Sequence, residues 1–320
     1  MKDNQAREAE SVPVIRQAAY IAAMPDGTLQ RSYGKVFNQV ADEYDRHRPT
    51  YPDALLDHAC EVAALSAGDR VLEIGCGTGQ LTQNLLARGL HVTAIEPGQQ
   101  LIALARQNLA DIGEVELVNA RLEDTPLPHG RFHAVLSASA MHWIDPDLGW
   151  QKAADALAPG GTLALIQYFG LNDPRSAEDQ QALLDAIAKI TPELAANCPS
   201  YWDIETILAG VHERRGNISD VWAWLGSYEM ARDYAAHLFD DAQIAAVPRL
   251  TEHAADELNA LLGTMSFWSR LSPQQREAIE HENRALHERL ARPIRSSILA
   301  CVVTARRAPY MESIPTRRSA

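Results

Sequence analysis

Short apolar runs alternate with stretches of helical spacing through the middle of the chain. The segments between the runs, such as 81–89 and 98–113, repeat apolar residues every three or four positions and predict helices. The runs themselves predict strands over 71–74, 91–96, 115–120, 133–139 and 162–169. Strand–helix alternation indicates parallel strands joined by crossover helices, so we predict an α/β fold with a doubly wound sheet.

Beyond Gly170 the pattern changes. Helical spacing predominates to about residue 240, with Ser176 as the expected cap of the first helix, and a further helix is expected from Thr251 and another from Ser272. A weak strand near 243–250 and a late strand over 296–307 complete a Rossmann-like, mostly parallel sheet of seven strands. We therefore expect an N-terminal extension or lid over 1–36 and a core over 37–170. A helical substrate-pocket insertion is expected over 171–240, the C-terminal part of the sheet over 241–307 and a disordered tail over 308–320.

Composition narrows the classes of partner. The chain has 320 residues, 46% apolar, with a formal charge of −13, which argues against nucleic-acid binding and against anionic membranes. No apolar run approaches the roughly 20 residues of a membrane helix. The four cysteines are widely spaced, so we expect reduced thiols in a cytoplasmic protein. The histidines show no metal-binding spacing, and nothing indicates the oligomeric state.

A glycine-rich loop follows the first strand in the sequence VLEIGCGTGQLT, residues 71–82. Its glycines follow the pattern G-x-G-x-G, whereas a dinucleotide site needs G-x-G-x-x-G. Backbone N–H groups at the start of the next helix suit a smaller anion, such as an amino-acid carboxylate. Glu96 ends the second strand and can accept both hydroxyls of a ribose. A ribose and an amino acid without a pyrophosphate describe S-adenosylmethionine (SAM).

Five motifs carry a family resemblance: VLEIGCGTGQLT, VTAIEP, ARLEDTPLP, HAVLSASAMHW and LAPGGTLAL. Their order and spacing resemble those of the class I SAM-dependent methyltransferases. Residues 37–52, FNQVADEYDRHRPTYP, resemble the N-terminal segment of the methyltransferase type 11 subgroup. The resemblance implies SAM as the cofactor and a small molecule as the second substrate.

The resemblance also implies which residues bind the cofactor. The glycine loop would line the methionine part, with Glu73 ending the strand beneath it, while Glu96 would bind the ribose. Arg121 and Leu122 stand where the family often has Asp or Thr, then Ala or Phe; Leu122 can pack on the adenine, but Arg121 cannot accept a bond from its amino group. The implied set is Tyr44, Arg48, Glu73, Gly75, Cys76, Gly77, Glu96, Pro97, Arg121, Leu122, Ser137 and Ala138.

Two residues are candidates for the transfer zone. His142 follows the fourth strand and is either a general base near neutral pH or only a wall of the pocket. Tyr168, at the end of the fifth strand, can place an aromatic face against a sulfonium. The other aromatic residues near the insertion, Trp222 and Trp224 among them, suit core packing better. Cys76 suits packing rather than nucleophilic attack.

Three functions remain open. The first is methyl transfer to a small-molecule acceptor by in-line displacement, with the pocket in 171–240. The second uses SAM as the sole substrate: its amino nitrogen closes an azetidine ring and releases methylthioadenosine. The third is a non-catalytic SAM-binding partner protein.

Overall fold

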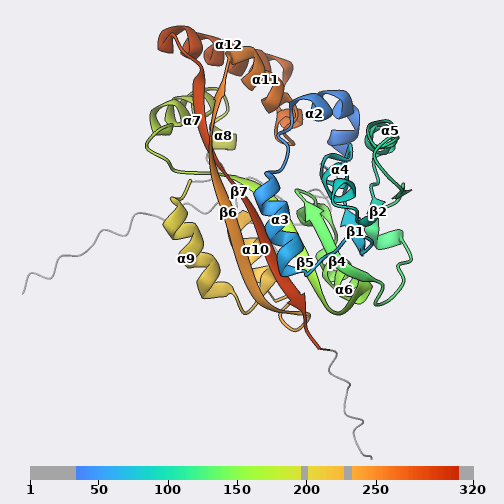
Figure 1. The fold of residues 1–320 in the computed structure, drawn as a ribbon. Helices are drawn as coiled ribbons and strands as arrows, with labels where there is room; N and C mark the ends of the chain where they lie inside the picture. Colours follow the sequence, from blue (N-terminus) through green and yellow to red (C-terminus); the bar gives the residue numbers. More distant parts are fainter. Residues whose placement is uncertain (1–33, 196–200, 227–232, 310–320) are drawn as a thin grey trace, which may run out of the picture.

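A seven-stranded sheet forms the centre of the molecule (Figure 1). The computed structural model describes residues 34–195, 201–226 and 233–309. Most of the predicted N-terminal extension and of the predicted tail therefore lies outside the described residues. The strands are β1 (Arg70–Ile74), β2 (His91–Ile95), β3 (Val115–Val118), β4 (Phe132–Ala138), β5 (Leu157–Gly170), β6 (Phe239–His253) and β7 (Ile294–Arg307).

Strand order establishes the topology as β3-β2-β1-β4-β5-β7-β6. The first five strands are parallel, and β7 runs antiparallel to both β5 and β6. The order reverses between β1 and β4, and ligands in doubly wound sheets bind outside the carboxyl ends of the strands at such a point. The predicted mostly parallel sheet is confirmed.

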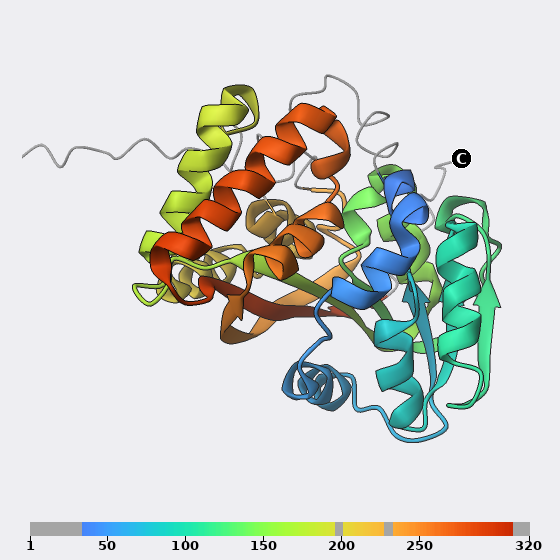
Figure 2. The same ribbon diagram turned by 90° about the horizontal axis from the view of Figure 1, so that it is seen from above.

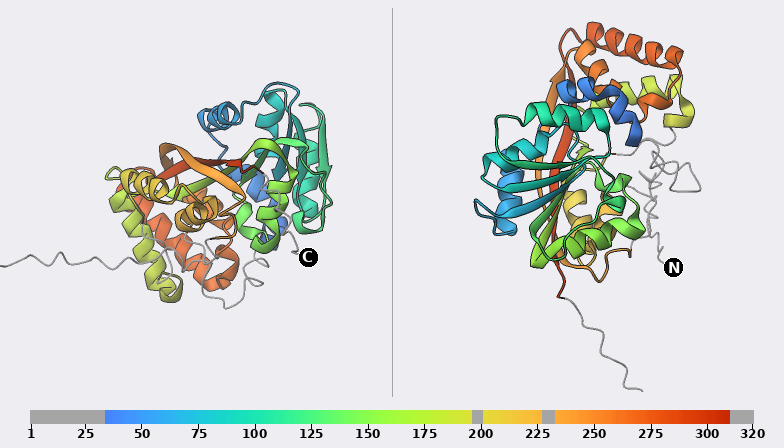
Figure 3. Two further views of the ribbon diagram at one scale, coloured as in Figure 1. Left: turned by 90° about the horizontal axis from the view of Figure 1, so that it is seen from below. Right: turned by 90° about the vertical axis from the view of Figure 1, so that its right-hand side faces the viewer.

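Helices cover both faces of the sheet, as the edge-on view in Figure 3 shows. One face packs against α3 (Asp53–Val62), α4 (Gln80–Ala87) and α5 (Gln99–Asn108), and the other against α6 (Pro146–Ala156), α9 (Ile204–Arg214) and α10 (Ile218–Gly226). Strand residues alternate between the two cores: Val71 faces the first and Leu72 the second.

A group of helices stands beyond the carboxyl ends of the strands, and we call it the helical cap: α7 (Ala177–Ile190), α11 (Ala255–Gly263) and α12 (Pro273–Leu290). The short α8 (Pro192–Ala195) follows α7. Seen from above, α7 and α12 run next to each other (Figure 2). The cap therefore combines a helix from the predicted insertion with two from 241–307, which we expected to complete the sheet.

Two predictions about helix starts are corrected. Thr251 still belongs to β6, because it pairs with Ser296 of β7, and α11 begins only at Ala255. Ser176 occupies the N-cap position of α7, but its hydroxyl bonds to the side chains of Gln180 and Ser297 and caps no backbone N–H of the helix. Ser272 caps α12 as expected, since its Oγ accepts from the N–H of Gln275 at 3.2 Å.

None of the helices in the described part of the chain is long and apolar enough to span a bilayer.

Candidate active site

A cavity of about 1350 Å³ lies at the carboxyl ends of β1, β2, β4 and β5. The strand ends and the glycine loop form its floor. Residues 34–52, which we call the roof segment, and the helical cap lie over it. A typical pocket for one ligand holds roughly 300–1,000 Å³, so this cavity has room for two molecules.

The glycine loop lines the cavity because its backbone adopts conformations that other residues avoid. Gly75 has φ of +75° and donates its N–H to the carbonyl of Ile95 at 2.8 Å. A Cβ on Gly75 would lie 2.3 Å from the Cβ of Ala140, so a larger residue does not fit. Among the described residues a Cβ on Gly77 would meet only Tyr44, at 3.9 Å, so the side of Gly77 facing the cavity is open to a ligand.

Glu96 lies next to this open space. Its carboxylate oxygens accept the N–H groups of Gly77 at 3.0 Å and Gly98 at 2.7 Å. Burial raises the pKa of Glu96, and these two N–H groups oppose the rise. Asn119 donates to the carbonyl of Glu96 and fixes the turn after β2. Each carboxylate oxygen keeps a lone pair beyond its N–H bond, so the residue fits two adjacent hydroxyl groups such as those of a ribose.

An apolar slot lies beyond Glu96, where an adenine is expected. Pro97, Leu101 and Leu122 line it. Arg121 also reaches the cavity, but its guanidinium pairs with Glu123 at 2.9 Å and stays half-exposed. A guanidinium offers donors and no acceptor. The lack of a side-chain role for Arg121 towards the adenine amino group stays a prediction.

Three residues predicted to bind the cofactor do not line the cavity. Ser137 is fully buried one residue before the end of β4 and donates its hydroxyl to the carbonyl of Ile74 at 3.1 Å, whereas its neighbour Ala138 does line the cavity. The Cys76 side chain packs into the core beneath the loop, where burial raises its thiol pKa. Glu73 lies below the loop, as expected, and accepts the Thr82 hydroxyl at 2.6 Å.

Tyr44 and Arg48 extend from the roof segment over the loop. The Arg48 guanidinium lies 5.0 Å from the centre of the Tyr44 ring and donates to the carbonyl of Thr264, just after α11, at 2.8 Å. Its Nε is buried and has no acceptor among the described residues. An unused donor of a cation beside Gly77 fits the carboxylate of a bound amino acid.

His142 and Trp143 lie in a 3-10 turn after β4, with their rings 4.6 Å apart. Complete burial and the nearby charge of Arg48 lower the pKa of His142 to about 3. A base that weak takes up few protons near pH 7, which disfavours the general-base alternative. His142 fits the other prediction, a neutral wall of the pocket.

Tyr168 lines the cavity from β5. Its hydroxyl donates to the carbonyl of Thr50 at 2.5 Å, and its ring stacks on Tyr51 at 5.6 Å. These contacts fix the ring and tie the roof segment to the sheet, so Tyr168 suits an aromatic wall better than a proton donor.

Sequence reasoning missed several lining residues. Phe37 packs edge-on against Trp143 at 5.8 Å, and Asn38 accepts the N–H of Gln100 at 2.7 Å. Both fall inside the N-terminal motif, which was a usable signal. The cap residues after 250 had no motif. Conversely Trp222 packs in the sheet core and Trp224 stacks on Trp202 at 4.5 Å, as the core-packing expectation required.

Comparison with known proteins finds a family match for the part of the chain that carries the glycine loop, Glu96 and His142, and this match does not include the roof segment or the helical cap. Residues 71–161 match a family described as a methyltransferase domain. An uncharacterized methyltransferase of Mycobacterium tuberculosis is 35% identical over 137 residues, which cover 43% of this chain and 54% of the relative. A demethylmenaquinone methyltransferase of Clavibacter sepedonicus is 27% identical over 184 residues, covering 55% of this chain and 75% of the relative.

One similar solved structure is a provisionally assigned type II methyltransferase from Anaeromyxobacter dehalogenans. The match covers 82% of this chain and 99% of the chain in that structure. It has a TM-score of 0.51 at 23% identity, and this likeness shows the fold alone. Residues 71–161 thus resemble the class I SAM-dependent methyltransferase family, as the sequence motifs predicted. SAM is the cofactor of that family. The chain spans about half the length of the first curated relatives it matches.

Proposed function

We propose that this chain transfers a methyl group from SAM to a small-molecule acceptor. The observation that carries the proposal is the single cavity of about 1350 Å³, which joins Gly77 and Glu96 to a second, apolar end under the helical cap. Space for two molecules supports a reaction between a cofactor and an acceptor. The relative named as a demethylmenaquinone methyltransferase also supports a small acceptor.

The residues of this chain would hold and align the reactants. Glu96 and Gly77 would bind the ribose and the methionine part, and Arg48 the carboxylate. SAM supplies a methyl group on a sulfonium, which is already a good leaving group, so in-line displacement depends mainly on alignment. Alignment of this kind contributes up to about 7–11 kcal/mol. Phe37, Trp143 and Tyr168 would keep water out of the transfer zone.

Glu96→Ala tests the cofactor half of the proposal. We expect the variant to bind S-adenosylhomocysteine more than tenfold more weakly in calorimetry, because the ribose hydroxyls lose both acceptors. Glu116→Ala is the matched control, since this exposed carboxylate of β3 bonds only to Thr93 among the contacts described. Unchanged affinity in Glu96→Ala would remove the ribose assignment.

Incubation with SAM separates the three functions. Methylated product and S-adenosylhomocysteine that form only with an acceptor support the transferase. Methylthioadenosine that forms from SAM alone would support the cyclase instead, although the apolar end of the cavity gives that reaction no support. Tight binding without turnover over a broad acceptor panel would favour a non-catalytic partner protein.

A further inference from the structure

We infer that the acceptor is an uncharged, mainly apolar molecule held under the helical cap. The inference rests on the proposed methyl transfer, because it names the class of acceptor for the same cavity. It is carried by the side chains of α7, α11 and α12 that line the cavity and by the distribution of charge around them.

The inner face of α7 is continuous and mostly apolar. Gln180, Leu183, Leu184 and Ile187 line the cavity. Their spacing of three, four and seven residues places them on one side of the helix. The three apolar side chains are only partly buried. Partly exposed apolar surface inside a cavity favours an apolar ligand, because contact removes that surface from water.

The opposite walls repeat this pattern. Leu258, Leu261 and Leu262 of α11 line the cavity at helical spacing, and Met265 and Phe267 follow them. Ile279 and Asn283, one turn apart on α12, complete the enclosure. Three helices from two distant parts of the chain thus direct apolar side chains at one space. The Met265 side chain is flexible, so it can pack against a ligand that carries a flexible apolar chain.

The charged lining residues come from outside the helical cap, and of these Arg48 reaches the cap by donating to the carbonyl of Thr264. The charged lining residues, Arg48, Glu96, Arg121 and Glu123, belong to the roof segment and the strand ends. The described lining residues of the helical cap include no Asp, Glu, Lys or Arg. An ionic group placed there would lose its hydration without gaining a partner of opposite charge, which is strongly unfavourable.

The charged side chains of the cap helices lie instead outside the cavity lining. Lys189 of α7 pairs with Glu282 of α12 at 2.8 Å, and Arg284 of α12 pairs with Asp256 of α11 at 3.1 Å. His253, which lines the cavity just before α11, has its pKa lowered mainly by burial and stays neutral near pH 7. The apolar interior is therefore a property of the inner faces and not of the whole helices.

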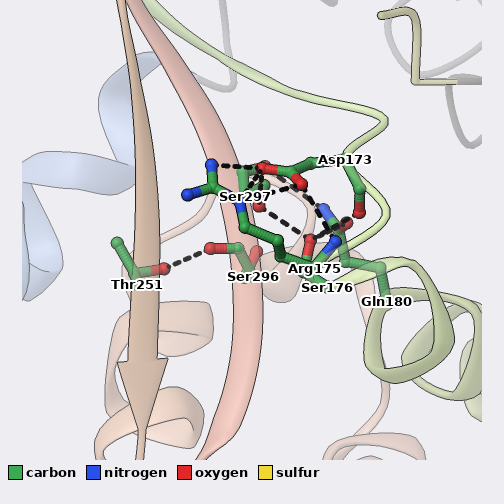
Figure 4. A network of polar contacts seen from close by, with 7 residues as sticks. All are labelled: Asp173, Arg175, Ser176, Gln180, Thr251, Ser296 and Ser297. Carbon is green, nitrogen blue, oxygen red and sulfur yellow. Dashed lines mark hydrogen bonds and ion pairs between the residues drawn. The ribbon is translucent and has the colours of Figure 1, made fainter.

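The polar lining residues of the helical cap are neutral, and two of them are amides. Gln180 accepts the Ser176 hydroxyl at 2.6 Å and donates to the carbonyl of Ser297 at 3.2 Å (Figure 4). Asn283 donates to Asn259 at 2.7 Å. Each amide has further donor and acceptor capacity. Groups of this kind can orient a hydroxyl or carbonyl but do not neutralise an ion.

A fluorescent probe tests the inference without any turnover. Uncharged 1-aminoanthracene should bind the full chain, and 4-octylphenol should displace it while 4-hydroxyphenylacetate does not. Leu184→Gln should weaken probe binding at least fivefold and leave the affinity for S-adenosylhomocysteine within twofold. Leu208→Gln is the matched control, because Leu208 lies on α9 outside the cavity lining and is 41% exposed; it should leave both affinities unchanged.

Measuring turnover gives a second test of the inference. With SAM, 4-octylphenol should give a kcat/KM at least tenfold above that of 4-hydroxyphenylacetate, which presents the same phenol on a charged molecule. Preference for the charged phenol, or displacement of the probe by it, would overturn the inference. If Leu184→Gln does not fold, displacement of the probe from the unmodified chain still tests the inference.

The two proposals fail in different ways. Loss of S-adenosylhomocysteine binding, or methylthioadenosine formed from SAM alone, would contradict the proposed function. A charged acceptor methylated with intact cofactor binding would contradict only the inference about the acceptor.

Discussion

At the scale of single residues, the cofactor end depends on close packing under the glycine loop. Gly75 contacts Ala140, Glu96 holds two backbone N–H groups, and Glu73 is buried below them with the Thr82 hydroxyl as its partner. Each of these contacts fixes the backbone on which the ligand would rest. Small changes here should therefore have measurable and separable effects.

Gly75→Ala should destabilise the protein more than Gly160→Ala. Both glycines have positive φ, +75° and +72°, so an alanine at either costs about 1–2 kcal/mol. At Gly160 no atom of the described residues lies within 4 Å of the added Cβ, but at Gly75 the Cβ of Ala140 is 2.3 Å away, which adds roughly 1–3 kcal/mol. Chemical denaturation measures the free energy of unfolding of both variants. Adding Ala140→Gly to Gly75→Ala should recover the part of the loss that comes from the clash. Equal losses at the two glycines would contradict the predicted clash.

Glu73→Gln should change how stability depends on pH. Burial raises the pKa of Glu73 from 4.5 to about 7. A raised pKa in the folded state means that its stabilising contribution is complete below pH 4.5 and is lost as the pH rises through about 7. The glutamine cannot ionise, so the variant should be more stable than the parent by roughly 2–3 kcal/mol at pH 8.5 and no more stable at pH 4.5. Thermal unfolding across this range would contradict the assignment if the difference did not vary with pH.

At the scale of elements, a polar network fastens α7 to the sheet (Figure 4). Asp173, between β5 and α7, pairs with Arg175 at 2.6 Å and accepts the hydroxyl of Ser297 in β7 at 3.0 Å. Ser176 bonds in turn to Ser297 and Gln180. The network therefore sets the direction in which α7 leaves the sheet, and with it one wall of the cavity.

Asp173→Asn should loosen this attachment. The Arg175 guanidinium, aided by the Arg175 N–H and Ser297, lowers the pKa of Asp173 from 3.8 to about 2. Its contribution is therefore present above pH 3.8 and is lost as the pH falls through about 2. We expect a loss of about 1–2 kcal/mol at pH 7 that shrinks below pH 3, measured by urea unfolding. Asp185→Asn, on the exposed side of α7, should have little effect; an equal loss there would argue against the network.

At the scale of the whole molecule, the cavity exists because three distant segments meet over the sheet. The roof segment bonds to α5 through Asn38 and to the end of α11 through Arg48. The cap is built from α7 on one side of β6 in the sequence and from α11 and α12 on the other. A cofactor that engages Arg48 would therefore contact the group that joins the roof segment to the helical cap.

Arg48→Gln should discriminate between two ligands. S-adenosylhomocysteine carries a carboxylate and methylthioadenosine does not. The variant should therefore bind S-adenosylhomocysteine at least about tenfold more weakly, and methylthioadenosine less than twofold more weakly. Calorimetry on both ligands measures the difference. Arg249→Gln is the control, because Arg249 reaches Thr50 at 3.5 Å but does not line the cavity. Equal weakening of both ligands would mean that Arg48 acts only by holding the roof segment in place.

Much of the fold and of the cofactor end could be predicted from local sequence. Apolar runs located the strands to within a few residues, because strand burial imposes a pattern that neighbours in sequence share. The loop at Gly75 and the acid at Glu96 were recognisable because a tight turn and a strand end restrict the residue type. Ser137 was placed wrongly, since sequence does not tell which residue at a strand end faces outward and which bonds inside the sheet.

The sequence by itself determined the order of strands and helices, the glycine loop and the acid opposite it, because these depend on contacts between residues close in the chain. Only the tertiary structure decided that Arg48 meets Thr264, that His142 is buried and therefore a weak base, and that α7, α11 and α12 enclose one apolar space. The physical reason is that burial and the local dielectric depend on residues far apart in the chain, which no local pattern specifies.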